Sequence, residues 1–159
     1  MNAAILVIGY GNTLRRDDGL GPRIAAELAV LNWPGVKALV VPQLLPELAE
    51  ALAACQLAIF VDARCDAPAT PITVQALAPA ADAWQPHGSN PAALLALARD
   101  AFGRAAPAYW LTVAGHDFGW GEGLSPEAER WVPEAVRAIA ALVNKCAATA
   151  RPSAGQVSG

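Results

Sequence analysis

Two carboxylates and one imidazole are placed in this 159-residue chain where they could form a metal site. Asp18 follows a glycine-containing loop, Asp62 ends the apolar run 57–61, and His87 lies in a segment rich in Pro, Ala and Gly. Carboxylate and imidazole donors together bind divalent ions such as Ni²⁺ or Zn²⁺, and this donor set does not distinguish between them. If the three side chains converge on one cleft, they leave coordination positions open for a substrate.

Each of these residues also has a purely structural interpretation. Asp62 could accept hydrogen bonds from neighbouring loop N–H groups, and His87 or His116 taken alone could be a packed or surface imidazole. Asp17 could cap the helix that follows it, because helix N-termini favour negative charge. Asp18 cannot cap the same position, and if its side chain projects into the cleft beyond the first strand, it faces Asp62 at the end of the third.

Other kinds of site have less support in the sequence. The run 9–12, Gly-Tyr-Gly-Asn, is similar to the start of a dinucleotide-binding loop. However, Leu14 stands where the third glycine is required, and no acidic residue ends the second strand, so the glycines are better explained by a tight turn. No G-x-S-x-G motif is present, and Cys65 has no base beside it in the sequence. The three cysteines lack C-x-x-C spacing, which argues against a disulfide framework and a thiolate zinc site.

Alternating apolar strands and amphipathic helices must position the candidate residues. The pattern predicts buried strands at 3–9, 36–41, 57–61 and 109–113, and a partly solvated, antiparallel edge strand at 70–77. It predicts helices at 20–31, 46–54, 91–102 and 126–148, with Pro133 expected to kink or split the last one. This alternation is typical of a three-layer α/β/α sandwich with a mostly parallel, twisted sheet of about five strands, a phosphorylase/hydrolase-like architecture.

The expected fold also predicts where the site lies. In mostly parallel sheets, ligands bind outside the carboxyl ends of the strands. Asp18, Asp62 and His116 all follow such ends in this interpretation, and His87 lies in a loop that is free to reach them.

Composition argues against several classes of function. The chain has 11 Lys and Arg against 14 Asp and Glu, a formal net charge of −3 and a pI near 5.3, so no basic field exists to bind nucleic acid. Its apolar runs are much shorter than the roughly 18 residues that a membrane span needs, and its N-terminus lacks a basic signal-peptide region. We therefore expect a cytoplasmic, monomeric protein without membrane segments, with one domain over 1–150 and a frayed tail over 151–159.

The run Ile5–Pro22 resembles the opening of the [NiFe]-hydrogenase maturation endopeptidases. The similarity continues through the run 60–63, His87 and the run 123–126, and so covers nearly the whole chain. The resemblance implies a three-layer α/β sandwich and an aspartyl-type endopeptidase. Members of this family remove a C-terminal extension from the precursor of the hydrogenase large subunit after nickel has been inserted.

Carried over position by position, the family's metal contacts fall on Asp18, Asp62 and His87. Many members have Glu where this chain has Asp18, which keeps the charge and shortens its reach by one methylene. The resemblance implies that nickel arrives with the substrate and that no organic cofactor takes part. The ion could polarise the scissile carbonyl, activate a water, or serve only for recognition, and either Asp17 or a metal-bound water could deliver the proton.

Two further interpretations concern the branch and the alternative function. The run 43–48, Gln-Leu-Leu-Pro-Glu-Leu, is similar to the Gln-Leu-Thr-Pro-Glu-Leu pattern of the branch that serves NAD-linked bidirectional hydrogenases, with Leu45 replacing its Thr. The alternative function is a non-catalytic binding module that inspects the nickel-loaded precursor as a chaperone. Trp120, which lies between two glycines, could then hold a peptide partner or fold back on its own loop.

Overall fold

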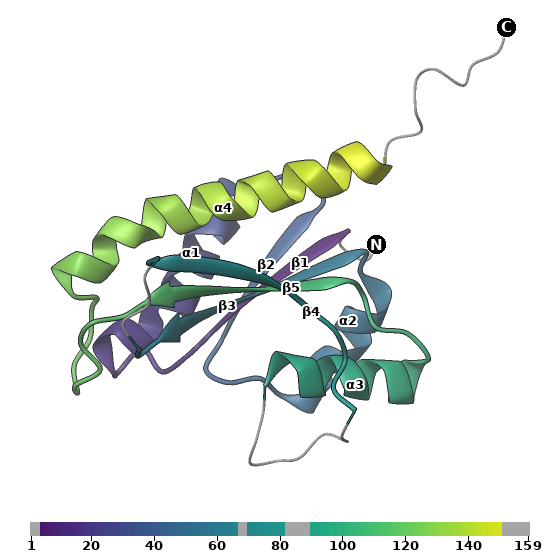
Figure 1. The fold of residues 1–159 in the computed structure, drawn as a ribbon, viewed down its shortest axis with the longest axis horizontal. Helices are drawn as coiled ribbons and strands as arrows, with labels where there is room; N and C mark the ends of the chain where they lie inside the picture. Colours follow the sequence, from purple (N-terminus) through teal and green to yellow (C-terminus); the bar gives the residue numbers. More distant parts are fainter. Residues whose placement is uncertain (1–3, 67–69, 82–89, 151–159) are drawn as a thin grey trace, which may run out of the picture.

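A five-stranded sheet forms the centre of the protein, for which the computed structural model describes residues 4–66, 70–81 and 90–150 (Figure 1). All neighbouring strands are parallel except β4, which runs antiparallel to β5 at one edge. The predicted antiparallel edge strand is thus confirmed. In spatial order, the strands are β2 (Val36–Val41), β1 (Ile5–Tyr10), β3 (Leu57–Arg64), β5 (Ala108–Ala114) and β4 (Ile72–Leu77).

Helices cover both faces of this sheet and complete the predicted three-layer sandwich. The helices α1 (Leu20–Leu31) and α4 (Pro126–Ala150) pack on one face, and α2 (Ala49–Ala54) and α3 (Pro91–Phe102) pack on the other, below the sheet in Figure 1. Asn90 caps α3 as predicted, because its side-chain oxygen accepts a hydrogen bond of 2.8 Å from the N–H of Ala93. None of the helices in the described part of the chain is long and apolar enough to cross a membrane.

The strands divide their side chains between two hydrophobic clusters. In β1, Ile5 and Val7 pack toward α1 and α4, whereas Leu6 and Ile8 pack toward α2 and α3. This division follows from the two-residue period of a strand, and it explains why β1 is apolar on both faces. By the same period, Tyr10 faces the α2 and α3 side of the sheet.

The strand β3 is longer than its apolar run predicts. We expected it to end before Asp62, but it continues to Arg64 because β5 pairs with it as far as Arg64 and Ala114. Pairing with β1 stops earlier, at Gly9 and Val61. Asp62 therefore lies inside a strand, at the point where that strand loses its neighbour on one side.

Of the two outcomes predicted at Pro133, a kink or a split, the split does not occur. Pro133 lies inside α4, which is assigned as one helix from Pro126 to Ala150. Proline lacks the N–H that would bond to the carbonyl of Glu129, four residues before it. Both residues are on the exposed side of the helix, where water can satisfy that carbonyl.

Gly21 allows α1 to pack directly on the sheet. A Cβ atom at this position would fall against the carbonyl oxygen of Val61 and lie 2.7 Å from that of Tyr10. We expect Gly21→Ala to lower the free energy of unfolding by about 1–3 kcal/mol, because the helix must move away from β1 and β3. Gly19→Ala is the matched control in urea unfolding, since its Cβ meets only Thr13 at ordinary contact distances. Equal stability of the two variants would contradict this close packing.

Candidate active site

The two predicted carboxylates lie where the direction of the chain connections reverses. From β1 the chain crosses to β2 on one side, whereas β3, the other neighbour of β1, leads on to the strands of the opposite side. In sheets of this type, the crevice at the carboxyl ends of two such strands is the usual ligand site. Asp18 follows β1 within a short 3₁₀ helix, Arg16–Gly19, and Asp62 lies near the end of β3.

Asp18 is half-buried and held by the loop that follows β1. Its Oδ2 atom accepts a short hydrogen bond of 2.6 Å from the N–H of Asn12. The loop can fold this tightly because Gly11 has a φ of 151° and a Cβ atom there would fall against the carbonyl oxygen of Asp18. This contact accounts for Gly11 without a bound dinucleotide.

Asp62 is a carboxylate in an unfavourable environment for its charge. Its pKa is raised to about 6. Burial is the largest cause of this increase, and the nearby negative charge of Asp18 contributes to it. Hydrogen bonds from the Ala63 N–H, at 2.8 Å, and from the Tyr10 hydroxyl lower the pKa but do not outweigh burial. Asp18 and Asp62 are thus near enough for their charges to interact.

Tyr10 is a residue of this site that the sequence analysis missed. Burial is the main reason that its pKa is raised far above the usual value of 10.0, and the charge of Asp62 and the hydrogen bond with Asp62 add to the shift. The parallel register could have identified it. Gly9 pairs with Val61, so the next residue on each strand, Tyr10 and Asp62, must be neighbours on the same face.

Asp17 does not cap the helix that follows it, and that expectation is wrong. Its carboxylate is completely buried and accepts hydrogen bonds of 2.7–2.9 Å from the N–H groups of His116, Asp117 and Ser125 and from the Ser125 hydroxyl. Burial tends to raise its pKa, but these hydrogen bonds outweigh burial and hold the pKa below its usual value. Asp17 thus ties the loop after β5 and the start of α4 to the candidate site. Its complete burial argues against a role as proton donor to a substrate.

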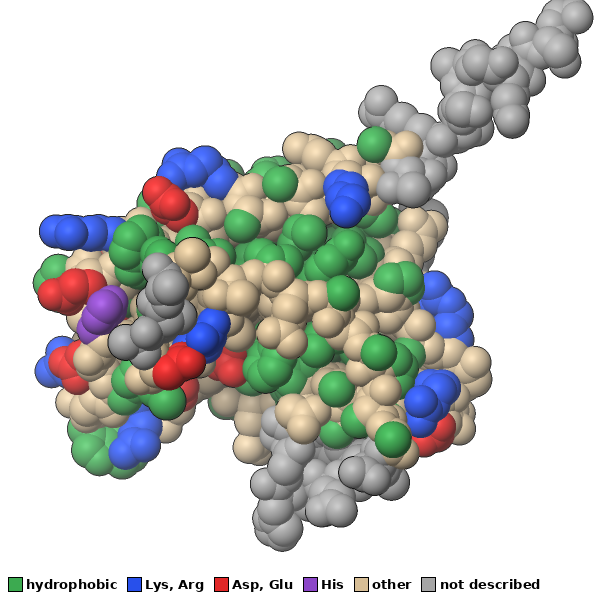
Figure 2. Space-filling view, in the orientation of Figure 1, with side chains coloured by type: hydrophobic (Ala, Val, Ile, Leu, Met, Phe, Trp, Pro, Cys, Tyr) green, Lys and Arg blue, Asp and Glu red, His purple; other side chains and the backbone are tan. Residues whose placement is uncertain are grey.

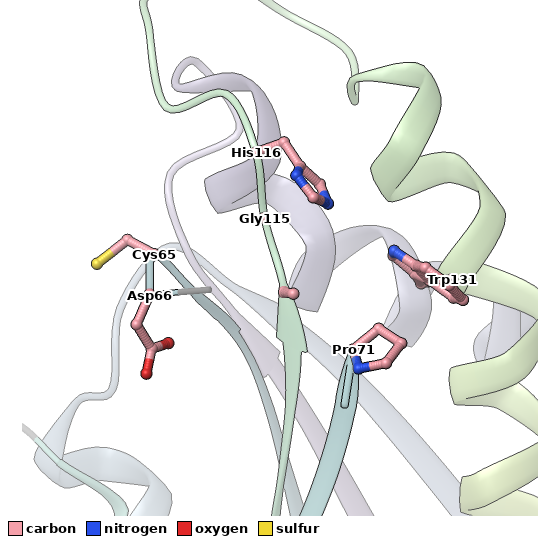
Figure 3. Close-up of a pocket in the computed structure, with 7 residues that line it drawn as sticks. Cys65, Asp66, Pro71, Gly115, His116 and Trp131 are labelled. Carbon is pink, nitrogen blue, oxygen red and sulfur yellow. The ribbon is translucent and has the colours of Figure 1, made fainter. Parts of the chain in front are cut away.

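The two histidines are not both available to this site. His87 lies outside the described residues, so the predicted third metal ligand stays a prediction. His116 is exposed and lines a separate pocket of about 390 Å³ together with Cys65 and Trp131. Figure 3 shows its imidazole turned toward Trp131, whereas the thiol of Cys65 points away. This arrangement gives no support to a Cys–His catalytic pair.

The donor set of the described residues fits part of the predicted metal site. Asp18 and Asp62 supply two carboxylates, and no group of three or more His, Cys, Asp or Glu side chains in the described residues is arranged to hold a metal ion. Carboxylate pairs in a partly buried crevice suit a divalent cation, because the cation removes the repulsion between them. The third donor that the sequence predicts, His87, is not among the described residues.

Trp120 is exposed over 70% of its surface and is not part of the core. The guanidinium of Arg15 lies 4.6 Å from the centre of its ring, a cation–π contact. Backbone hydrogen bonds between Gly121 and both Leu14 and Arg16 join the two loops that carry these side chains. The loop after β5 and the loop after β1 therefore form one connected rim beside the site.

Comparison with known proteins identifies the fold. No protein-family model and no curated protein matches the chain. The hydrogenase maturating endopeptidase HybD from E. coli has a TM-score of 0.73 and 22% identity, over 89% of this chain and 92% of that chain. A hydrogenase 2 maturation peptidase from a Thaumarchaeota archaeon has a TM-score of 0.66 and 20% identity, over 88% and 97%. The [NiFe] hydrogenase maturation protease HybD from Thermococcus kodakarensis has a TM-score of 0.62 and 19% identity, over 87% and 97%. This chain therefore has the α/β fold of the hydrogenase maturation endopeptidases.

Proposed function

We propose that this protein is an endopeptidase that removes the C-terminal extension of a nickel-loaded [NiFe]-hydrogenase large-subunit precursor. One observation carries the proposal. Asp18 and Asp62 interact electrostatically near the carboxyl ends of the neighbouring strands β1 and β3, in a fold shared with structures described as hydrogenase maturation endopeptidases. The resemblance of Ile5–Pro22 to the opening of that family supports the same conclusion from the sequence.

The electrostatics of the crevice favour a cation carried by the substrate. Burial and the charge of Asp18 make ionised Asp62 unfavourable, and a divalent ion between the two carboxylates reverses this situation. In this proposal Asp18, Asp62 and His87 complete the coordination of the nickel of the precursor. The bound ion supplies Lewis acidity next to the scissile peptide bond, and no organic cofactor takes part.

The residues around the two carboxylates orient them before the substrate arrives. The N–H of Asn12 fixes one oxygen of Asp18, and the N–H of Ala63 fixes one oxygen of Asp62. The Tyr10 hydroxyl lies beside the Asp62 carboxylate on the same face of the sheet. Each carboxylate thus has one oxygen fixed by a main-chain N–H, and this preorganisation lowers the cost of binding the ion.

Removal of the third ligand tests the assignment of the site. We expect His87→Ala to abolish processing of a co-expressed precursor and to leave the free energy of unfolding unchanged. The matched control is His116→Ala, the other histidine of the chain, which we expect to process the precursor normally. Processing is measured as the fraction of the large subunit that has lost its C-terminal peptide. Normal processing by His87→Ala would remove His87 from the mechanism.

A further inference from the structure

In the described part of the chain, no strand pairs with the outer side of β4, which presents its main-chain groups in a regular order. The N–H of Ala114 donates to the carbonyl of Pro71 at 2.8 Å, so these two residues form a hydrogen-bonded pair of the antiparallel ladder between β4 and β5. Hydrogen-bonded pairs recur at every second residue of such a ladder. Residues 73, 75 and 77 therefore face β5, and the N–H and C=O groups of Ile72, Val74 and Ala76 point to the free edge.

Within its bounds Ile72–Leu77, β4 carries neither a charged residue nor a proline, although Pro71 directly precedes it. Natural edge strands carry charged residues, prolines or bulges that prevent the addition of another strand. The opposite edge, β2, contains Lys37, whereas β4 contains no charged residue. Val74 is 40% exposed, and the next two residues, Gln75 and Ala76, are exposed as well. Figure 2 shows hydrophobic side chains gathered between α4 and α3, on the side of the molecule where β4 lies in Figure 1.

The outer edge of β4 and Asp62 of the candidate site are related by paired residues on three neighbouring strands. Asp62 pairs with Thr112, and Thr112 pairs with Thr73 of β4. Neighbouring strands lie about 4.8 Å apart, so a strand added outside β4 would lie about 15 Å from Asp62. An extended chain covers that distance with about four or five residues. A peptide cut at the candidate site can therefore reach this edge with its next few residues.

We propose that the free edge of β4 binds the C-terminal tail of the precursor as an additional strand. The inference rests on the proposed function and adds the place where the released segment is held. In this proposal the tail leaves the candidate site and pairs with Ile72, Val74 and Ala76. Because main-chain groups carry the recognition, the edge accepts tails of different sequence, provided that they are extended and free of proline at the paired positions.

Amide hydrogen exchange measured by NMR on the full chain tests this directly. In the free protein, the N–H groups of residues 73, 75 and 77 should be protected and those of Ile72, Val74 and Ala76 should exchange rapidly. The probe is a synthetic peptide that copies the C-terminal tail of a hydrogenase large-subunit precursor. At saturating peptide, exchange at Ile72, Val74 and Ala76 should slow by at least about tenfold, and the three inward amides serve as the internal control.

The same peptide with N-methyl groups at alternate residues provides a second control. Methylation of the N–H groups that would point toward β4 should abolish the protection, whereas methylation of those that would point away from β4 should not. Unchanged exchange at the three outward amides would overturn the inference. Protection in the free protein that rises with protein concentration would also overturn it, because a second copy of the chain would then occupy the edge. Cleavage of the precursor without protection of the edge removes this inference alone, whereas protection without cleavage removes the protease proposal alone.

Discussion

The Asp17→Ala variant should lose about 3–5 kcal/mol of its free energy of unfolding, because three main-chain N–H groups and one hydroxyl lose their acceptor in a buried site. Urea unfolding at neutral pH measures this loss. The matched control is Asp117→Ala, an adjacent exposed carboxylate paired with Arg16, for which we expect a loss of about 1 kcal/mol or less. Similar stability of the two variants would show that Asp17 does not hold these loops together.

The contribution of Asp17 also has a defined pH dependence. Its pKa in the folded protein lies below the usual value of 3.8, so its stabilisation is present above pH 4 and is lost as the pH falls through the lowered pKa. The stability difference between wild type and Asp17→Ala should therefore be constant from pH 5 to 8 and should shrink in more acidic solution. A difference that grows on acidification would contradict the hydrogen-bonded, ionised state of this carboxylate.

The Asp62→Asn variant should lose processing activity and become more stable. Ionised Asp62 is unfavourable in the folded protein, where its pKa is raised from 3.8 to about 6. A shift of about two pH units corresponds to a penalty on the order of 2–3 kcal/mol, which asparagine avoids at neutral pH. We therefore expect Asp62→Asn to exceed the wild type in unfolding free energy at pH 7.5, in metal-free buffer, and to leave the precursor uncut.

The pH series checks the sign of this effect. Below about pH 4, Asp62 is protonated in both the folded and the unfolded chain, so wild type and Asp62→Asn should be equally stable. The difference should appear between pH 4 and 6 and stay constant above that range. Asp66→Asn replaces an exposed carboxylate whose pair with Arg64 lowers its pKa, so this control should lose a little stability near neutral pH rather than gain any. A less stable Asp62→Asn variant at pH 7.5 would contradict burial as the cause of the raised pKa.

Local signals in the sequence were sufficient to place Asp18 and Asp62 near the carboxyl ends of neighbouring strands. Asp62 directly follows an apolar run, Asp18 follows the glycine loop, and strand ends on one edge of a parallel sheet must lie near each other. The helix bounds Leu20–Leu31 and Pro91–Phe102 also agree with the prediction, since capping and proline signals act within a few residues. These features depend on short-range rules that the order of residues displays.

Features that depend on distant partners could not be predicted from the same signals. Asp17 is held by donors 99 to 108 residues away, and no local pattern links them. The strand β3 extends to Arg64 only because β5 lies beside it. Pro133 is tolerated because it lies on the solvent side of α4, which depends on how the whole helix packs. In each case tertiary structure decided between two locally acceptable conformations.

The most direct test of the proposed function is intact-mass spectrometry of a co-expressed hydrogenase large-subunit precursor, with nickel supplied or withheld. The proposal predicts that the precursor loses the mass of a C-terminal peptide with the wild-type protein and nickel, and keeps its full mass without nickel or with Asp62→Asn. An unchanged mass in the presence of wild-type protein and nickel, although the two proteins purify together, would contradict the protease and favour a non-catalytic binding module.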